Sequence, residues 1–195
     1  MASNPRSILV ITGPTGIGKT DLAMRLADES PIRIISADSV MVYRHLNIGS
    51  AKPAVSELER YPHDLIDLVE PEYPFDVGQY LFHAKRSIQH AWQRNEVPCL
   101  VGGTILYLKS LLDGLDPLPK ADPDIRKRIR EKAEQQGWPA IHDWLKGLDP
   151  GAAEIIHPNH SSRIERALEV RLKTGESIRS FWTEGPSEFM IGDQR

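Results

Sequence analysis

The 195-residue sequence predicts an α/β fold in which a parallel β-sheet is flanked by helices and joined to a small helical subdomain. Three observations predict this fold. A glycine-rich loop at residues 13–20 connects a short β-branched run to a helical pattern. Two further apolar runs each follow a helical pattern, and alternating strands and helices are typical of parallel sheets with right-handed crossovers. From residue 115 to about residue 180 the pattern indicates helices and no strand.

The loop at residues 13–20 matches the P-loop pattern G-x-x-x-x-G-K-[ST] at every fixed position. It lies between an expected strand at 7–12 and an expected helix at 21–30. The backbone N–H groups of such a loop surround an anion, and the dipole of the following helix adds a favourable field. The motif is shared by ATP-binding and other nucleotide-binding proteins, so it predicts a site for a pyrophosphate or polyphosphate and nothing narrower.

Within this loop we expect Lys19 to contact terminal phosphate oxygens and Thr20 to hold a magnesium ion. The residues expected to bind the phosphates are Gly13, Pro14, Thr15, Gly16, Ile17, Gly18, Lys19 and Thr20.

A second short strand at 32–36 leads into Asp38, which therefore lies at the carboxyl end of a strand. Ligands of open parallel sheets bind at that edge, so Asp38 is expected to face the phosphate site. A carboxylate there binds magnesium, orients a water molecule or takes a proton from a nucleophile. The alternative is that Asp38 only caps the next turn, and position alone does not separate the two.

The next stretch, residues 40–74, is rich in turn signals and predicts a long functional connection with a possible short strand at 65–69. Lys52 lies in this connection. It is either a second cation for the phosphates or a solvated surface lysine.

Asp76 and Gln79 are spaced as a capping box at the start of a helix that continues to residue 95. A third strand follows at 97–101 and ends in Gly102-Gly103-Thr104, again at a carboxyl edge. Thr104 is a candidate to hydrogen-bond the acceptor substrate; the alternative is that it is only the N-cap of the helix at 106–112.

The segment 115–180 is expected to form a helical subdomain with helices at 122–136, at 138–148 and after Pro158, the last of which ends at Gly175. The mixed charges of the first of these helices favour a solvated face.

The third of these helices begins with Ser162 and Glu165 at capping-box spacing. Arg163 and Arg166 near its N-terminus oppose the helix dipole, so they indicate either a phosphate-backbone contact or ordinary surface arginines.

Composition places the chain in the ordinary soluble class, with 40% hydrophobic and 26% charged residues. No secretory signal or membrane-length apolar run is found, so a cytoplasmic location is expected. The net charge of −3 argues against a broadly basic nucleic-acid-binding surface but permits local basic patches. The single cysteine, Cys99, lies in an apolar strand and is expected to be buried and unreactive.

Taken in order from about residue 7 to about residue 175, the motifs closely resemble those of bacterial tRNA dimethylallyltransferases. The motifs that carry the resemblance are GPTGIGKT (13–20), SADSVMVYR (36–44), IGSAKP (48–53), LID (65–67), VGGTILY (101–107), IHPN (156–159), and Arg163 with RALEV (166–170).

This resemblance implies transfer of a dimethylallyl group from dimethylallyl diphosphate to N6 of adenosine 37 in the tRNA anticodon loop. It implies magnesium, a pyrophosphate leaving group and a purine flipped into a pocket. Asp38 resembles the family's general base, and Thr104 matches a position that contacts the acceptor. The positions that match tRNA-binding residues are Asp38, Ser39, Val40, Met41, Thr104, Arg126, Ser162, Arg163, Ile164, Glu165 and Arg166.

The chain departs from the family pattern in three places. Many members have Gln in place of Met41 and Asp in place of His160, and members continue beyond the point where this sequence stops. The expected boundaries are a P-loop core at 1–114, a helical tRNA-binding insertion at 115–180, and a tail at 181–195 that resembles nothing we can place. A complete chain is expected to be monomeric, whereas this isolated 195-residue chain is expected to be poorly stable or self-associating.

Three alternative functions share part of this pattern. A small-molecule P-loop kinase would share the first 40 residues, and an isopentenyltransferase acting on free AMP would share the chemistry. A truncated, non-catalytic remnant that binds pyrophosphate or RNA is the third.

Overall fold

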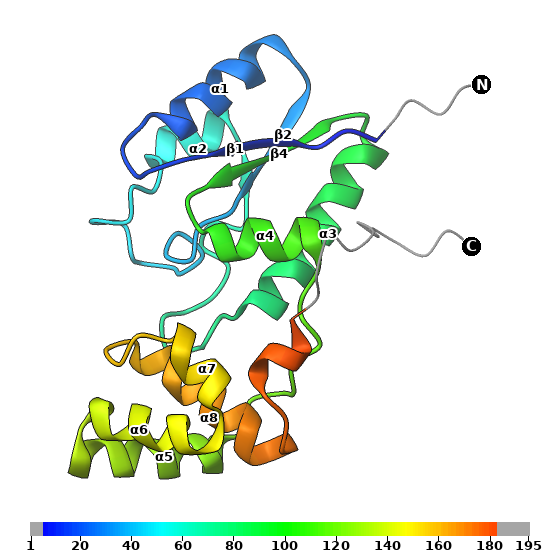
Figure 1. Cartoon of the computed structure of the whole chain (residues 1–195). Helices are drawn as coiled ribbons and strands as arrows, with labels where there is room; N and C mark the ends of the chain where they lie inside the picture. Colours follow the sequence, from blue (N-terminus) through cyan, green and yellow to red (C-terminus); the bar gives the residue numbers. More distant parts are fainter. Residues whose placement is uncertain (1–5, 183–195) are drawn as a thin grey trace. The chain divides into compact units, whose positions relative to one another are not determined.

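The computed structural model describes residues 6–182, which form two compact units, 6–114 and 115–182 (Figure 1). The division falls between Gly114 and Leu115. No helix between residues 6 and 182 is both long and apolar enough to cross a lipid bilayer.

The first unit is built on a four-stranded, wholly parallel sheet with the strand order β1-β4-β2-β3. The strands are β1 (Leu9–Thr12), β2 (Ile32–Ser36), β3 (His63–Asp64) and β4 (Val97–Gly102). β4 lies between β1 and β2 and pairs with both, so that Cys99 is in register with Leu9 on one side and Ile34 on the other. The carboxyl ends of the three main strands therefore lie at one edge of the sheet.

Helices cover both faces of this sheet, as Figure 1 shows. They are α1 (Lys19–Glu29), α2 (Val55–Arg60), α3 (Val77–Gln93) and α4 (Ile105–Asp113). Ile34 and Cys99 face the buried side of α1, whereas Ile35 and Leu100 face α3 and α4. Because neither face meets water, the central strands are apolar at successive positions, which is why they are recognisable as buried strands in the sequence.

The connection between β2 and α3 differs from the expected pattern. The strand in this connection is β3 at 63–64 and not the possible strand at 65–69, because Leu65 and Asp67 have φ values of 64° and 52°, which a strand does not accommodate. Helix α2 was not predicted; it has six residues and none is buried, so it leaves no hydrophobic periodicity. The capping box of α3 is confirmed: Asp76 and Gln79 each accept the other's backbone N–H at 2.9 Å.

The second unit consists of helices alone. They are α5 (Pro123–Gln136), α6 (Trp138–Leu148), α7 (Pro150–Ile155), α8 (Ser161–Thr174) and the 3₁₀ helix η1 (Ile178–Phe181). The core is formed by fully buried aliphatic side chains such as Ile129, Ile141 and Leu168. Phe181 packs against this core, so the unit continues past residue 180. The rest of the predicted tail, 183–195, lies outside the described residues.

The predicted capping box of α8 is wrong. The N-cap lies two residues earlier, at His160, so the helix begins at Ser161 and has no side-chain cap. The Glu165 carboxylate instead accepts two hydrogen bonds from Arg130 of α5, at 2.8 and 3.3 Å. Gly175, with φ of 77°, ends α8 as expected.

Candidate functional site

The P-loop joins β1 to α1 and leaves the helix N-terminus open. Gly16 and Gly18 have φ values of 83° and 87°, in the left-handed region that favours glycine. Gly18 is the N-cap of α1, so no side chain caps the first turn of this helix. Lys19 Nζ donates to the carbonyl oxygen of Pro14 at 2.8 Å, which folds the lysine back over the loop.

A cavity of about 370 Å³ lies beside this loop, entirely within the first unit. Its lining is drawn from residues 15–21, 36–41, 49–53 and 101–103, together with His63. Of the eight residues predicted to bind phosphate, five line it: Thr15, Gly16, Gly18, Lys19 and Thr20. The wall opposite the P-loop is formed by the end of β2 and the connection that follows it.

Asp38 lies in this cavity and also caps a turn. Its Oδ1 accepts the backbone N–H groups of Val40 at 2.8 Å and Met41 at 3.2 Å. Among the described residues, Oδ2 accepts no hydrogen bond. The two alternatives for Asp38 are therefore compatible, since one oxygen fixes the carboxylate while the other is available to a ligand.

Thr104 lies at the N-cap of α4, but its side chain does not cap that helix. Its Oγ1 accepts the backbone N–H of Ser39 at 3.0 Å, and its own N–H donates to the carbonyl of Ala37 at 3.2 Å. Thr104 and Ser39 do not line the cavity, whereas Asp38 does. Thr104 thus connects the turn at Asp38 to the end of β4. The carboxyl ends of β2 and β4 therefore lie together, as expected for parallel strands.

Gly102, the last residue of β4, explains why the chain has a glycine pair here. A Cβ at this position would lie 2.1 Å from the carbonyl oxygen of Ala37, far inside van der Waals contact. Only glycine therefore lets β4 approach the end of β2 this closely.

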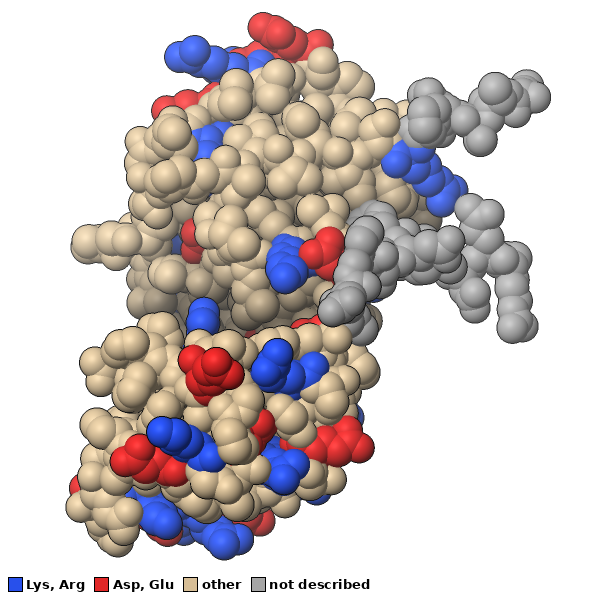
Figure 2. All heavy atoms as spheres, in the orientation of Figure 1, with Lys and Arg blue, Asp and Glu red and all other residues tan. Residues whose placement is uncertain are grey.

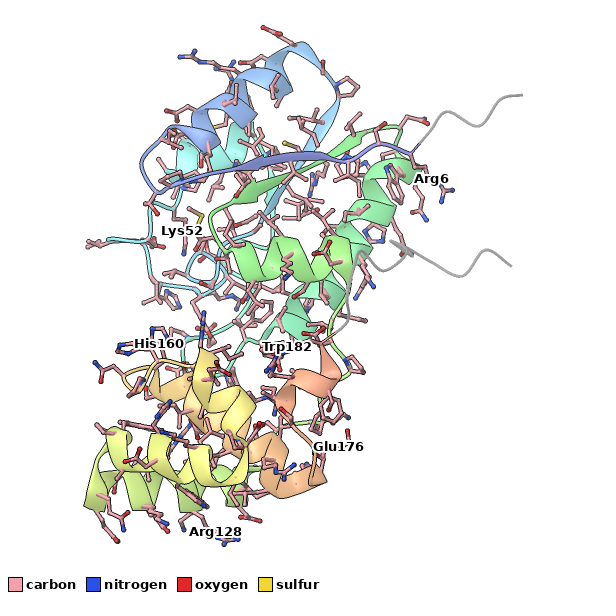
Figure 3. The ribbon with its side chains drawn as sticks, viewed as in Figure 1. Arg6, Lys52, Arg128, His160, Glu176 and Trp182 are labelled. Atoms are coloured by element: carbon pink, nitrogen blue, oxygen red, sulfur yellow. The ribbon has the colours of Figure 1, made fainter. Side chains whose placement is uncertain are left out.

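Lys52 is not a solvated lysine, and it does not line the cavity. Its side chain is 4% exposed, and Nζ donates to the carbonyl of Tyr43 at 2.9 Å, to Asn47 Oδ1 at 3.0 Å and to Asp67 Oδ1 at 2.7 Å. Figure 3 shows it among the loops that follow β2. It cross-links these loops and so fixes the cavity wall that they form.

Two cavity residues were missed by the sequence interpretation. Ser50 is 8% exposed, and its Oγ has no hydrogen-bond partner within residues 6–182. His63 Nε2 is likewise buried without such a partner, while burial lowers the pKa of the ring. The available signals were that both residues lie in the connection expected to be functional and that Ser50 belongs to the IGSAKP motif.

The cavity is lined by oxygen-bearing side chains of the kind that bind magnesium. The Thr20 hydroxyl and the carboxylates of Asp21 and Asp38 line it, all of them hard oxygen ligands. Residues 6–182 contain no cluster of three or more His, Cys, Asp or Glu side chains suited to a metal ion. Magnesium in phosphate sites takes one or two protein ligands and completes its octahedron with phosphate oxygens and water.

In the helical unit, two of the arginines predicted to bind tRNA are engaged by Glu169, whose side chain is fully buried. Arg126 donates to its carboxylate at 2.8 and 3.0 Å, and Arg166 also pairs with it and donates to the carbonyl of Pro119 at 2.7 Å. These contacts give a structural reason for the presence of Arg166 near the N-terminus of α8.

The other predicted RNA contacts on α8 divide by exposure. Ile164 is fully buried in the helical core, so its side chain offers no surface to RNA, and Glu165 is buried and paired with Arg130. Ser162 and Arg163 are exposed. Figure 2 shows acidic and basic side chains mixed over the face of this unit that it presents, in agreement with the expected solvated face.

Comparison with known proteins shows extensive similarity. The sequence profile of the IPP transferase family matches residues 41–192, and that of isopentenyl transferase matches residues 6–67. Over 178 residues the chain is 48% identical to tRNA dimethylallyltransferase 2 of Hahella chejuensis, covering 91% of this chain and 53% of that protein. It is 47% identical to the tRNA dimethylallyltransferase of Acidithiobacillus ferrooxidans, covering 90% and 52%. The chain spans about half the length of these curated relatives.

Solved structures give the same result. The full-length tRNA isopentenylpyrophosphate transferase of Bacillus halodurans matches with a TM-score of 0.56 and 37% identity, over 89% of this chain and 57% of that one. A eukaryotic dimethylallyltransferase acting on tRNA matches with a TM-score of 0.68 and 28% identity, over 89% and 43%. The family match extends to residue 192, so it includes most of the segment 181–195 that the sequence alone left unassigned. The chain belongs to the IPP transferase family.

Proposed function

We propose that this chain carries the donor site and the acceptor base of a tRNA dimethylallyltransferase. In this reaction a dimethylallyl group passes from dimethylallyl diphosphate to N6 of adenosine 37 in tRNA, and pyrophosphate is released. The observation that carries the proposal is that the P-loop and the Asp38 carboxylate line one cavity. The names of the relatives, tRNA dimethylallyltransferases, support the same substrate pair.

The P-loop side of the cavity suits the diphosphate. Lys19 would exchange its contact with the Pro14 carbonyl for phosphate oxygens, and the uncapped first turn of α1 would direct N–H groups at the anion. Thr20 would hold magnesium, which when bound neutralises the leaving pyrophosphate. These groups stabilise the negative charge that develops on the bridging oxygen as its bond to carbon breaks.

The Asp38 side of the cavity suits the acceptor amine. The N6 nitrogen forms a bond to C1 of the allylic group, the C1–O bond breaks with its electron pair going to pyrophosphate, and a proton leaves N6. Asp38 Oδ2 would take that proton, while the N–H groups of Val40 and Met41 hold Oδ1 in place. Thr104 would act on this step as a positioning residue, through Ser39.

For the tRNA, the exposed residues at the start of α8 are the candidates that the fold leaves available. Arg163 is exposed, and among the described residues no ion pair engages it. Arg126 and Arg166 would contact RNA only with the part of each guanidinium that Glu169 leaves exposed. Arg163→Ala should therefore weaken tRNA binding and reduce its salt dependence while diphosphate binding is unchanged.

The test is incubation of the chain with labelled dimethylallyl diphosphate, magnesium and unmodified tRNA, followed by nucleoside analysis. Asp38→Asn should lower transfer by about 10²–10⁴-fold with diphosphate binding near normal. Lys19→Ala should weaken diphosphate binding first. Asp28→Asn is the matched control, because Asp28 is an exposed carboxylate of α1 outside the cavity.

Two outcomes would contradict the proposal. Transfer of phosphate from ATP without binding of the allylic diphosphate would make the chain a kinase. Loss of diphosphate binding in Asp38→Asn, with acceptor binding intact, would make Asp38 a magnesium ligand and remove it as the base.

A further inference from the structure

The cavity wall contains two polar atoms whose hydrogen-bonding capacity no described protein group meets. Ser50 Oγ and His63 Nε2 are each buried and unpartnered, and both residues line the cavity that holds the P-loop. A buried polar atom without a partner costs about 1–3 kcal/mol, so native structures seldom keep one without a use.

These atoms belong to the cavity wall that faces the P-loop. His63 is in register with Ile34 across the β2–β3 pair, so its side chain leaves the sheet on the face that Ile34 presents to α1. Helix α1 begins at the P-loop, and its first-turn residues Thr20 and Asp21 line the same cavity. The wall that contains His63 and Ser50 therefore faces the expected position of the diphosphate and its metal.

The chemistry of His63 restricts what it can bind. Its Nδ1 lies in hydrogen-bond contact with the carbonyl of Tyr61, and a carbonyl only accepts, so Nδ1 carries the proton. Burial lowers the pKa of the ring and so favours the neutral form, in which Nε2 is an acceptor. An unprotonated phosphate oxygen is also an acceptor, so Nε2 of the neutral ring does not bond to the diphosphate directly. It requires a ligand that donates an N–H or O–H.

We propose that Ser50 and His63 form a hydration subsite for magnesium diphosphate, in which His63 Nε2 accepts from, and Ser50 Oγ bonds to, water molecules of the hydrated ion. Magnesium keeps several water molecules when it binds phosphates, and those waters are strong donors. The subsite rests on the proposed diphosphate function, and it gives the connection between β2 and α3 a role in metal-dependent donor binding. Ser50 and His63 are positioning residues, since they act through water.

The test compares pyrophosphate binding with and without magnesium by isothermal titration calorimetry, using the full chain. Ser50→Ala should reduce the magnesium-dependent gain in pyrophosphate affinity by about 10-fold, the usual effect of losing an outer-shell partner, and leave metal-free binding unchanged. The melting temperature of Ser50→Ala should not fall, because removing the hydroxyl leaves no protein group without its hydrogen-bond partner. Ser110→Ala is the matched control: Ser110 is 5% exposed on α4 and lies outside the cavity.

His63→Phe should lose the same magnesium-dependent gain. This change also removes the hydrogen-bond partner of the Tyr61 carbonyl, so the melting curve of His63→Phe must be measured as well. If His63→Phe does not fold, the result for Ser50→Ala alone tests the proposal. Equal affinities for Ser50→Ala and Ser110→Ala in magnesium would overturn the subsite, as would an equal loss with and without the metal. If the wild-type chain itself fails to bind magnesium pyrophosphate, the proposed function fails with it.

Discussion

The strongest stability prediction concerns the buried carboxylate of the helical unit. Glu169 is fully buried and accepts from Arg126, from Arg166 and, at 2.6 Å, from the backbone N–H of Asp122 at the N-cap of α5. Glu169→Gln keeps the shape but removes the charge, which leaves two guanidinium groups without a counter-ion.

The magnitude follows from the exposure of the partners. Breaking a buried ion pair costs about 3–5 kcal/mol, but the side chains of Arg126 and Arg166 are 34% and 24% exposed, so water recovers part of the loss. We expect a loss of about 2–3 kcal/mol in unfolding free energy, which for a small helical unit lowers its melting temperature by roughly 10–20 °C. Differential scanning calorimetry and far-UV circular dichroism measure the shift.

Glu165→Gln is the matched control on the same helix. Its partner Arg130 is 59% exposed and remains hydrated, so the expected loss is below about 1 kcal/mol. Equal shifts for the two variants, or no shift for Glu169→Gln, would refute the account of Glu169 as the anchor of the unit.

The same carboxylate gives a pH dependence with a definite sign. Burial opposes ionisation of Glu169, but the hydrogen bonds from Arg126, Asp122 and Arg166 outweigh it and lower the pKa below its ordinary value of 4.5. Its stabilisation is therefore complete above pH 4.5 and lost as the pH falls through the lowered pKa. The difference in stability between wild type and Glu169→Gln should be full at pH 7 and shrink below pH 4.5.

The other predictions concern the first unit. Gly102→Ala should cost about 3 kcal/mol or more in urea denaturation, because its Cβ would collide with the Ala37 carbonyl; Gly147→Ala, where nothing lies within 4 Å of the added Cβ, should not destabilise. Lys52→Met should lower the melting temperature by removing three hydrogen bonds, and an unchanged melt with weaker pyrophosphate binding would make this lysine a phosphate ligand after all. Cys99, whose pKa burial raises to about 11, should resist iodoacetamide at pH 7.5 in the folded chain and react in urea; labelling of the folded chain at the rate of a free thiol would contradict its burial. Light scattering should show self-association of the isolated 195-residue chain, since within the described residues β1 pairs on one side only, and a monodisperse monomer would argue against an exposed pairing edge.

The sequence predicted the features that depend on local pattern or on a general rule of topology. The P-loop and β1, β2 and β4 follow from glycine spacing and apolar runs. The contact of Ser39, next to Asp38, with Thr104, 65 positions later, follows because the carboxyl ends of parallel strands share one edge. The central strands can be recognised in the sequence because burial on both faces of the sheet requires apolar residues at nearly every position of these strands.

What the sequence did not predict depends on partners far away in the chain. Glu169 meets Arg126 across 43 positions and Lys52 meets Asp67 across 15, and no periodicity marks either pair. Glu165 had the spacing of a capping residue, yet Arg130 from another helix is its partner. A short exposed helix such as α2 leaves no apolar stripe to detect.

The strand order has a consequence for how the site is made. β1 and β2 are successive along the chain but never touch, because β4 is inserted between them and supplies the hydrogen bonds to both. The chain must therefore close a loop of almost 90 residues before the strand that carries the P-loop can join the sheet, and closing so long a loop delays folding. During synthesis on a ribosome, the P-loop emerges among the first residues, yet β1 has no strand to pair with until β4 has been synthesised. The earliest motif of the sequence is thus completed late, and an mRNA cut short before β4 would yield a nascent chain that lacks the cavity beside the P-loop.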